Sequence, residues 1–401
     1  MFINRQLSAI IVKVRRNFPA IVLTGPRQSG KTTLLKHLFG EKTNFISLDS
    51  PETRIWANED PENFLDSHET PLIIDEIQNA PNLLPYIKAR IDNNRKPGQW
   101  VLTGSQEFSV MKNMSESLAG RIATLTLLPF SFSETKKQLF KNWREYFQNI
   151  IKQNPGKKNL GKTILEGSYP EIITKKNTQI NLWYESYIQT YLEKDLKIIY
   201  DIGNLNLFTK FLRLLANRTG QILNLSSLAN DLGTSVPTVK KWVSILEATR
   251  IIYLLQPYYK NNGKRLIKSP KIYFLDTGLV AHLTGIRTEE ALLKGPLAGQ
   301  LFETFVVSEF VKQFYYIESI TPPLYYVNHK NLWEIDLVLD MNGELTPIEI
   351  KLTSTVMARH FQNFQKFRNT YKNVAKFNYL ICNQRDPLLR QNTQIIYWGN
   401  L

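Results

Sequence analysis

Eight residues near the N-terminus, GPRQSGKT at 25–32, have the types and spacing that bind a phosphate chain. Gly25, Gly30, Lys31 and Thr32 satisfy the pattern G-x-x-x-x-G-K-[ST], between an apolar run and a helix-like run. The glycines let backbone N–H groups surround a phosphate, the lysine reaches the β- and γ-phosphates, and the threonine hydroxyl ligates Mg²⁺. The stretch therefore predicts a site for ATP and Mg²⁺. The other residues predicted to contact the nucleotide are Arg27, Gln28, Ser29 and Thr33.

Two adjacent carboxylates, Asp75 and Glu76, end the apolar segment PLIIDE at 71–76. Asp75 is predicted to hold the Mg²⁺ shell, and Glu76 to orient and deprotonate the attacking water. Two acids at a strand end can also mark the mere start of a loop. Because a phosphate-binding loop precedes them, the pair indicates an ATP site that hydrolyses its nucleotide.

The elements that must position these residues alternate along residues 1–135. Near-continuous apolar strands separated by helices indicate a parallel sheet covered on both faces, which is an α/β fold. The predicted strands are 20–25, 44–50, 71–76, 100–105 and 122–130, and a helix is predicted at 109–120. Beyond this core the sequence predicts a helical lid or linker at 136–215, a helix–turn–helix and hairpin at 216–285, and a further α/β segment at 286–401.

The ordered motifs resemble a family of bacterial and archaeal AAA+ ATPases that carry a C-terminal domain of unknown function. The segments that carry the resemblance are LTGPRQSGKTTLL, ISLD, IIDEIQNAP, LTGS, SLAGR, GSYPEI and KSPKIYFLDTGL, and they extend over nearly the whole chain. The resemblance implies a P-loop AAA+ core and a C-terminal part similar to PD-(D/E)XK nucleases, with a restriction-endonuclease-like fold. It indicates no substrate.

The same resemblance implies two further residues of the ATP site. A polar residue at the tip of the strand WVLTGS senses the γ-phosphate in AAA+ proteins, and of Thr103 and Ser105 the prediction is Ser105. Arg121 stands where these proteins place an arginine finger that reaches a neighbouring subunit, which implies a homo-oligomer, with a hexameric ring as one form. The alternative for Arg121 is a solvated arginine at a helix end.

Residues 216–285 favour a DNA-binding winged helix–turn–helix. Apolar residues at helical spacing are interrupted by DLGTS, whose glycine suits the turn between two helices. Residues predicted to contact DNA are Thr238, Lys240 and Lys241 on the second helix, and Lys264, Arg265 and Lys268 at the hairpin. The alternative is a winged helix that packs against protein.

Three acids and a lysine in the last region could form a second metal site. Glu303 lies in an amphipathic helix, Asp336 in the strand-like WEIDLVLD, and Glu349 and Lys351 in PIEIKL, where alternation places both on one face. Such carboxylates can bind a divalent cation that activates water, with the lysine stabilising the phosphate. Ile335 stands where the PD-(D/E)XK motif has proline. An inactive nuclease-like site is the alternative.

Composition limits the remaining possibilities. The 401 residues carry a net charge of +15, with 50 Lys and Arg against 35 Asp and Glu, which suits a polyanionic partner such as DNA. One cysteine, and no apolar stretch long enough to span a bilayer, predict a cytoplasmic protein without membrane contact. The sequence thus predicts an AAA+ ATPase that drives or regulates action on DNA. Two alternatives are an ATP-dependent switch for protein partners and an ATP-gated, metal-dependent nuclease.

Overall fold

Five parallel strands form the N-terminal sheet, in the order β2-β3-β4-β1-β5. The computed structural model describes residues 2–40, 43–104, 118–152, 158–175, 177–195, 202–259, 268–329, 332–385, 389–390 and 392–401. The strands of this sheet are β1 (Ala20–Thr24), β2 (Asn44–Ser47), β3 (Leu72–Asp75), β4 (Trp100–Gly104) and β5 (Ile122–Thr126). The parallel α/β core predicted from the sequence is therefore confirmed.

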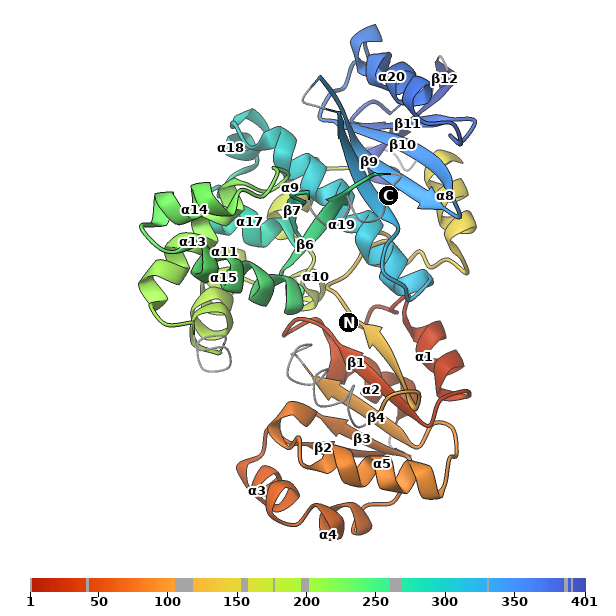
Figure 1. Cartoon of the computed structure of the whole chain (residues 1–401), viewed down its shortest axis with the longest axis vertical. Helices are drawn as coiled ribbons and strands as arrows, with labels where there is room; N and C mark the ends of the chain where they lie inside the picture. Colours follow the sequence, from red (N-terminus) through yellow and green to blue (C-terminus); the bar gives the residue numbers. More distant parts are fainter. Residues whose placement is uncertain are drawn as a thin grey trace.

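Helices cover both faces of this sheet (Figure 1) because successive side chains of each strand point to opposite sides. Ile21 and Leu23 of β1 pack in one apolar cluster with residues of α1 and α2, whereas Ala20 and Val22 pack in another with residues of α3, α4 and α5. The helices of this region are α1 (Ser8–Arg15), α2 (Lys31–Phe39), α3 (Pro51–Glu59), α4 (Pro61–Asp66), the short 3₁₀ helix η1 (Ile77–Asn79) and α5 (Leu83–Asn93).

Strand β5 ends at Thr126, earlier than the predicted strand at 122–130. Pro129 has no N–H to offer a neighbouring strand. The carbonyl oxygens of Leu128 and Pro129 instead accept hydrogen bonds from side chains, including the hydroxyl of Tyr316 at 2.6 Å from each. The predicted helix at 109–120 lies mostly outside the described residues.

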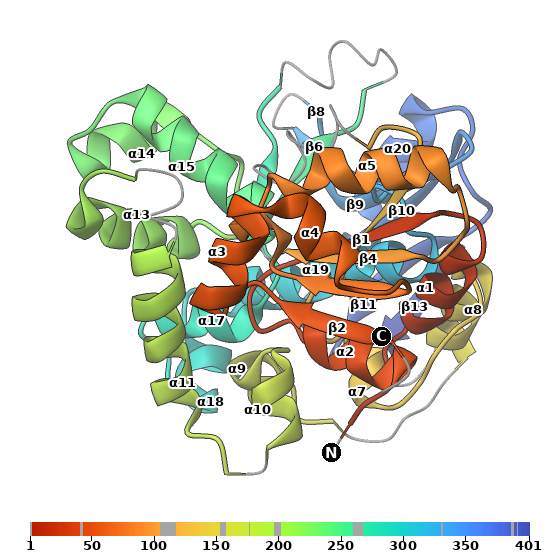
Figure 2. The same cartoon turned by 90° about the horizontal axis from the view of Figure 1, so that it is seen from below.

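The middle of the chain is helical (Figure 2). Its first group of helices comprises α7 (Phe132–Thr135), α8 (Trp143–Lys152), α9 (Leu160–Glu166), α10 (Pro170–Thr174), α11 (Ile180–Tyr187) and the π-helix η2 (Ile188–Asp195). Its second group comprises α13 (Leu205–Asn217), α14 (Leu225–Leu232) and α15 (Val236–Ala248). Gly233, in the left-handed conformation, makes the turn between α14 and α15, as the sequence predicted for the helix–turn–helix.

An eight-stranded sheet occupies the C-terminal part, in the order β12-β13-β11-β10-β9-β8-β6-β7. Strands β6 (Ile252–Pro257) and β7 (Lys271–Phe274) form the antiparallel hairpin predicted after the helix–turn–helix, but β6 also pairs in parallel with β8. The hairpin therefore shares its sheet with the segment predicted at 286–401. The other strands are β8 (Leu324–His329), β9 (Trp333–Met341), β10 (Glu344–Lys351), β11 (Asn378–Cys382), β12 (Leu389–Arg390) and β13 (Thr393–Tyr397).

The helix α19 (Ala298–Ile317) crosses the centre of the molecule between the two sheets (Figure 1). It contacts β7 and β10 of the C-terminal sheet and β5 of the N-terminal sheet. The remaining helical elements are α17 (Thr277–Leu283), α18 (Glu289–Lys294), η3 (Ala358–Phe361), α20 (Gln362–Thr370) and η4 (Trp398–Asn400). Within the described part of the chain, no helix combines the length and apolar character needed to cross a membrane.

Candidate functional site

The predicted phosphate-binding loop leaves β1 after Thr24 and enters α2 at Lys31. Gly25 has φ 143°, and a Cβ there would lie 2.0 Å from the carbonyl oxygen of Leu127, so no other residue fits without moving the backbone. Gly30 has φ 91° and caps α2. The two glycines of the motif are thus required by backbone geometry, and the loop ends at a helix N-terminus, where anions are favoured.

Lys31 lies across this loop and is buried. Its Nζ donates to the carbonyl oxygens of Gly25 at 2.9 Å and Pro26 at 3.1 Å. Burial lowers the pKa of the Lys31 ammonium, although the carboxylates of Glu76 and Asp75 act in the opposite direction. The lysine and both predicted acids therefore belong to one electrostatic environment.

Asp75, at the end of β3, joins two neighbouring elements by hydrogen bonds. The Thr32 hydroxyl of α2 donates to Asp75 Oδ2 at 2.8 Å, and the Thr103 hydroxyl of β4 donates to Asp75 Oδ1. Carboxylate and hydroxyl oxygens are the ligands that Mg²⁺ prefers. Because the Thr32 hydroxyl and the Asp75 carboxylate lie in direct contact beside the loop, these two residues fit the predicted Mg²⁺ site.

Glu76 follows Asp75 in the left-handed conformation, with φ 57° and ψ 49°. This conformation is costly for a residue with a Cβ and is often found at functional sites. Its backbone N–H donates to Thr103 Oγ1 at 3.3 Å, and its carboxylate accepts from the Gln78 amide. Thr103 therefore contacts both acids. Ser105, which the resemblance implies as the sensor of the γ-phosphate, lies outside the described residues and stays a prediction; the contacts of Thr103, two residues earlier in the same segment, were not predicted.

A cavity of about 540 Å³ adjoins the phosphate-binding loop at Gln28 and Gly30. It is bounded by the N-terminal segment, the start of α2 and helix α10. Among its lining residues are Phe2, Ile3, Gln28, Gly30, Thr33 and Glu171. Its position beside the predicted phosphate site and its mixed apolar and polar lining suit the base and ribose of a nucleotide.

The two remaining loop residues contact other parts of the chain. The Arg27 guanidinium lies 5.7 Å from the centre of the Tyr191 ring in η2, which is a cation–π arrangement. Ser29 is buried, and its carbonyl oxygen accepts from Arg5 at 2.8 Å. No feature of the motif pattern indicated Arg5.

Arg121, the predicted arginine finger, forms a two-pronged ion pair within its own chain. Its Nε and Nη2 lie 2.5 and 3.0 Å from the two carboxylate oxygens of Asp92, near the end of α5. The Arg121 side chain is 26% exposed. Its Nη1 also donates to the Ala119 carbonyl oxygen at 3.0 Å, and a bidentate pair is among the stronger ion pairs, so Arg121 would have to leave Asp92 to reach another anion.

The predicted DNA-contact residues fall partly within the described chain. Lys240 and Lys241 are exposed on α15, and Thr238 bonds its hydroxyl to Ser235 at 2.8 Å in the cap of that helix. Lys268 is exposed just before β7, in the connection between the two strands of the hairpin. Lys264 and Arg265 lie outside the described residues.

The predicted nuclease-like residues pair with two lysines, Lys351 and Lys271, and Lys271 also acts electrostatically on Asp336. Lys351 Nζ lies 2.7 Å from Asp336 Oδ2 and 2.9 Å from Glu349 Oε2. Glu303 instead accepts from Lys271 at 3.2 Å and from the Tyr273 hydroxyl at 2.5 Å. Among the described residues, no group of three histidine, cysteine, aspartate or glutamate side chains could hold a metal ion.

The pKa values of the two acids that share Lys351 are shifted in opposite directions. Burial raises the pKa of Glu349 well above its usual value, and the neighbouring Asp336 carboxylate raises it further. The pKa of Asp336 is lowered although burial opposes this, because the Lys351 and Lys271 ammonium groups favour its ionised form. Lys351 thus offsets the negative charge here, which is the arrangement expected of the alternative, an inactive nuclease-like site.

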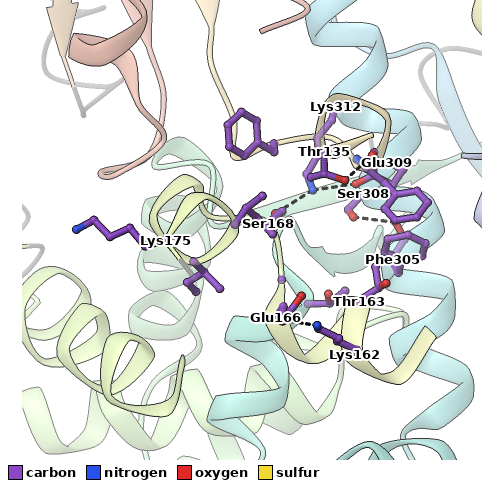
Figure 3. A pocket seen from close by; sticks show the side chains of 16 residues that line it. Thr135, Lys162, Thr163, Glu166, Ser168, Lys175, Phe305, Ser308, Glu309 and Lys312 are labelled. Atoms are coloured by element: carbon purple, nitrogen blue, oxygen red, sulfur yellow. Dashed lines mark hydrogen bonds and ion pairs between the residues drawn. The ribbon is translucent and has the colours of Figure 1, made fainter. Parts of the chain in front are cut away.

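A second cavity, of about 390 Å³, lies between α9, α10 and α19 (Figure 3). Ser168 donates from its N–H and its hydroxyl to Asp276 Oδ2, at 2.7 and 2.8 Å. Lys312 of α19 donates to the Ser168 hydroxyl at 3.1 Å and to Glu309 at 3.0 Å. Ser168 belongs to the segment GSYPEI and Asp276 to KSPKIYFLDTGL, so these two segments are connected by buried hydrogen bonds to each other and to α19.

Comparisons with known proteins agree with the geometry of the loop. Residues 17–136 match the model of an AAA domain. Residues 157–290 and 298–401 match two domains of unknown function, DUF8612 and DUF4143. Residues 17–136, which hold the phosphate-binding loop, Asp75 and Glu76, are therefore similar to AAA domains.

Relatives are similar to the chain over most of its length. An uncharacterized protein of Mycobacterium tuberculosis is 29% identical over 356 residues, which are 88% of this chain and 74% of the relative. An uncharacterized protein of Methanocaldococcus jannaschii is 24% identical over 364 residues, 86% of this chain and 78% of the relative.

Two solved structures are similar to parts of this chain. The Walker-type ATPase of Pyrococcus abyssi is 14% identical, covers 71% of this chain and 96% of its own, and has a TM-score of 0.40. The RuvB Holliday junction branch migration motor of Thermotoga maritima is 16% identical, covers 67% and 96%, and has a TM-score of 0.31.

Proposed function

We propose that this chain binds Mg²⁺–ATP at the loop between β1 and α2 and hydrolyses it to ADP and phosphate. The observation that supports this best is the contact of Thr32 with Asp75, at 2.8 Å, directly beside Lys31. It brings together a cation for the phosphates, two oxygen ligands for Mg²⁺ and, in the next residue, a carboxylate base.

Each residue has a distinct part in the reaction. The Lys31 ammonium would exchange its two carbonyl partners for phosphate oxygens and neutralise their charge. Glu76 would accept a proton from the water that attacks the γ-phosphorus, while the bond from that phosphorus to the bridging oxygen breaks and ADP leaves. When bound by Thr32 and Asp75, Mg²⁺ would neutralise charge on the β- and γ-phosphates. Thr103 would hold Asp75 and Glu76 in position through its hydrogen bonds to the Asp75 carboxylate and the Glu76 N–H.

Two substitutions test this function. Lys31→Ala should weaken ATP binding, whereas Glu76→Gln should bind ATP and leave it unhydrolysed, with turnover lowered by about 10²–10⁴-fold. Glu69→Gln, at an exposed acid of the same domain, is the matched control. Phosphate release and ATP affinity should be measured for all four proteins. Equal turnover by Glu76→Gln and the unmodified chain would reject Glu76 as the base.

We propose that the chain binds DNA and that ATP hydrolysis drives or regulates its action on the DNA. The supporting observation is the pair of exposed lysines on α15, Lys240 and Lys241, in a chain with a net charge of +15. The second candidate is a switch for protein partners, for which α15 would contact protein. ATP turnover measured with single-stranded, duplex and branched DNA distinguishes them, because only the first predicts stimulation by DNA.

A further inference from the structure

Arg5 lies just before α1 and is buried, with 3% of its surface exposed. Its guanidinium donates to the Ser29 carbonyl oxygen at 2.8 Å, to the Leu128 carbonyl oxygen at 2.6 Å and to the Tyr316 hydroxyl at 3.0 Å. Its Nε pairs with Glu134 Oε1 at 3.1 Å. One side chain therefore joins the phosphate-binding loop, the segment after β5, helix α7 and helix α19.

The bond to Ser29 fixes the orientation of a peptide group inside the loop. The carbonyl oxygen of Ser29 and the N–H of Gly30 belong to one planar trans peptide and point in opposite directions. Holding the oxygen toward Arg5 therefore aims the Gly30 N–H away from Arg5. Gly30 has no Cβ and accepts both signs of φ, so its own backbone preference does not prevent this peptide from rotating.

Glu134 holds Arg5 in place from the opposite side. Its Oε1 also accepts the Gln6 N–H at 2.6 Å, and its Oε2 accepts the Ser131 N–H at 2.8 Å in the cap of α7. The carboxylate is fully buried. A buried arginine whose charge is paired and whose donors reach four acceptors has little freedom to move.

Tyr316 connects this arrangement to the C-terminal sheet. It lies near the end of α19, which packs against β7 and β10. Its hydroxyl lies 2.6 Å from both the Leu128 and the Pro129 carbonyl oxygens and accepts a hydrogen bond from Arg5. Two successive hydrogen bonds, through Tyr316 and Arg5, thus lead from α19 to the Ser29 carbonyl.

We propose that Arg5 is a positioning residue for the phosphate-binding loop and that, through Tyr316, it couples nucleotide binding to helix α19. This inference rests on the proposed ATP site. Because coupling between two sites is reciprocal, a partner that displaces α19 would change ATP affinity, and ATP would change the affinity for that partner.

The test uses the full chain with Arg5→Lys and Tyr316→Phe. Lysine keeps the charge but cannot reach four acceptors with a planar fork. We expect Arg5→Lys to weaken ATP binding by about tenfold, the equivalent of one charge-assisted hydrogen bond, and Tyr316→Phe by a smaller factor. The double variant should bind ATP no more weakly than Arg5→Lys, because the hydroxyl acts through the guanidinium. Tyr315→Phe, at the adjacent residue of α19, is the matched control.

Hydrogen–deuterium exchange without nucleotide provides an independent measurement. In both variants exchange should rise in peptides covering 25–33 and stay unchanged in peptides covering β11. Unchanged exchange in the loop and unchanged ATP affinity in folded Arg5→Lys would overturn the inference, as would a rise spread evenly over the chain. If the unmodified chain binds no ATP, the proposed function fails, and exchange in the loop still decides whether Arg5 positions it.

Discussion

Removal of the Thr103 hydroxyl should slow ATP hydrolysis while leaving ATP binding nearly intact. Thr103→Val keeps the shape of this fully buried side chain but deletes the group that donates to Asp75 Oδ1 and accepts from the Glu76 N–H. The loop, Lys31 and the contact of Thr32 with Asp75 are not touched by the change. The substitution should therefore alter mainly the positions of Asp75 and Glu76.

The size of the effect follows from the bonds that the substitution removes. A hydrogen bond to a charged group contributes about 1.5–3 kcal/mol, which corresponds to a factor of roughly 10–150 in rate if it is fully expressed in the transition state. Removal of the acceptor for the Glu76 N–H adds to this, because Glu76 is held in a conformation that its backbone does not favour. We expect kcat to fall by that factor and the Kd for ATP to change by less than about threefold.

The assay is steady-state phosphate release together with titration of a fluorescent ATP analogue. Thr103→Ser retains the hydroxyl and should retain most of the turnover, which separates loss of the bond from loss of the side chain. Thermal unfolding should show that Thr103→Val is folded at the assay temperature. Turnover equal to that of the unmodified chain, or weakened ATP binding with unchanged kcat, would refute the reasoning.

Four further predictions concern other parts of the chain. Arg121→Ala should lower turnover with little loss of ATP binding and be partly rescued by mixing with a subunit that lacks Lys31; full activity in a strict monomer would contradict this. Replacing Lys240 and Lys241 by glutamine should reduce the salt dependence of DNA binding by about 0.9 in slope for each DNA phosphate that is no longer neutralised, and an unchanged slope would place the DNA-binding surface elsewhere. Asp336→Ala should lower the melting temperature and leave ATP turnover intact, whereas loss of a Mg²⁺-dependent DNA cleavage would instead assign a nuclease. Burial lowers the pKa of Lys136 from 10.5 to about 8, so between these pH values the unfolded chain binds more protons than the folded chain. The free energy of unfolding should therefore rise with pH over this range. Urea unfolding should show a smaller rise for Lys136→Met.

The ATP site could be predicted from sequence because its determinants are local. The glycines, Lys31 and Thr32 lie within eight residues, and the spacing itself encodes a turn that only glycine can make at Gly25. Asp75 ends an apolar strand and Glu76 follows it, and parallel strands bring their carboxyl ends to one edge of a sheet. Alternating apolar segments likewise predicted the α/β core, since burial on both faces leaves a continuous apolar run.

The partners of these residues were decided by the tertiary structure. The sequence predicts that Glu303, Asp336 and Glu349 share one pocket. It does not predict their partners, which in the fold are Lys271 and Tyr273 for Glu303 and Lys351 for the other two acids. No local sequence pattern indicates which lysine forms an ion pair with which buried carboxylate.

Arg5 illustrates the same limit at the ATP site. Its contacts with Ser29, Glu134 and Tyr316 join residues that are 24, 129 and 311 positions apart. In the sequence it is a single arginine ahead of an apolar run, with no spacing that marks it. The sequence by itself determined which residues can bind phosphate, because a turn and a strand end are local structures. Only the fold decided what holds them in place, because a buried charge is satisfied by whichever partners packing brings within reach.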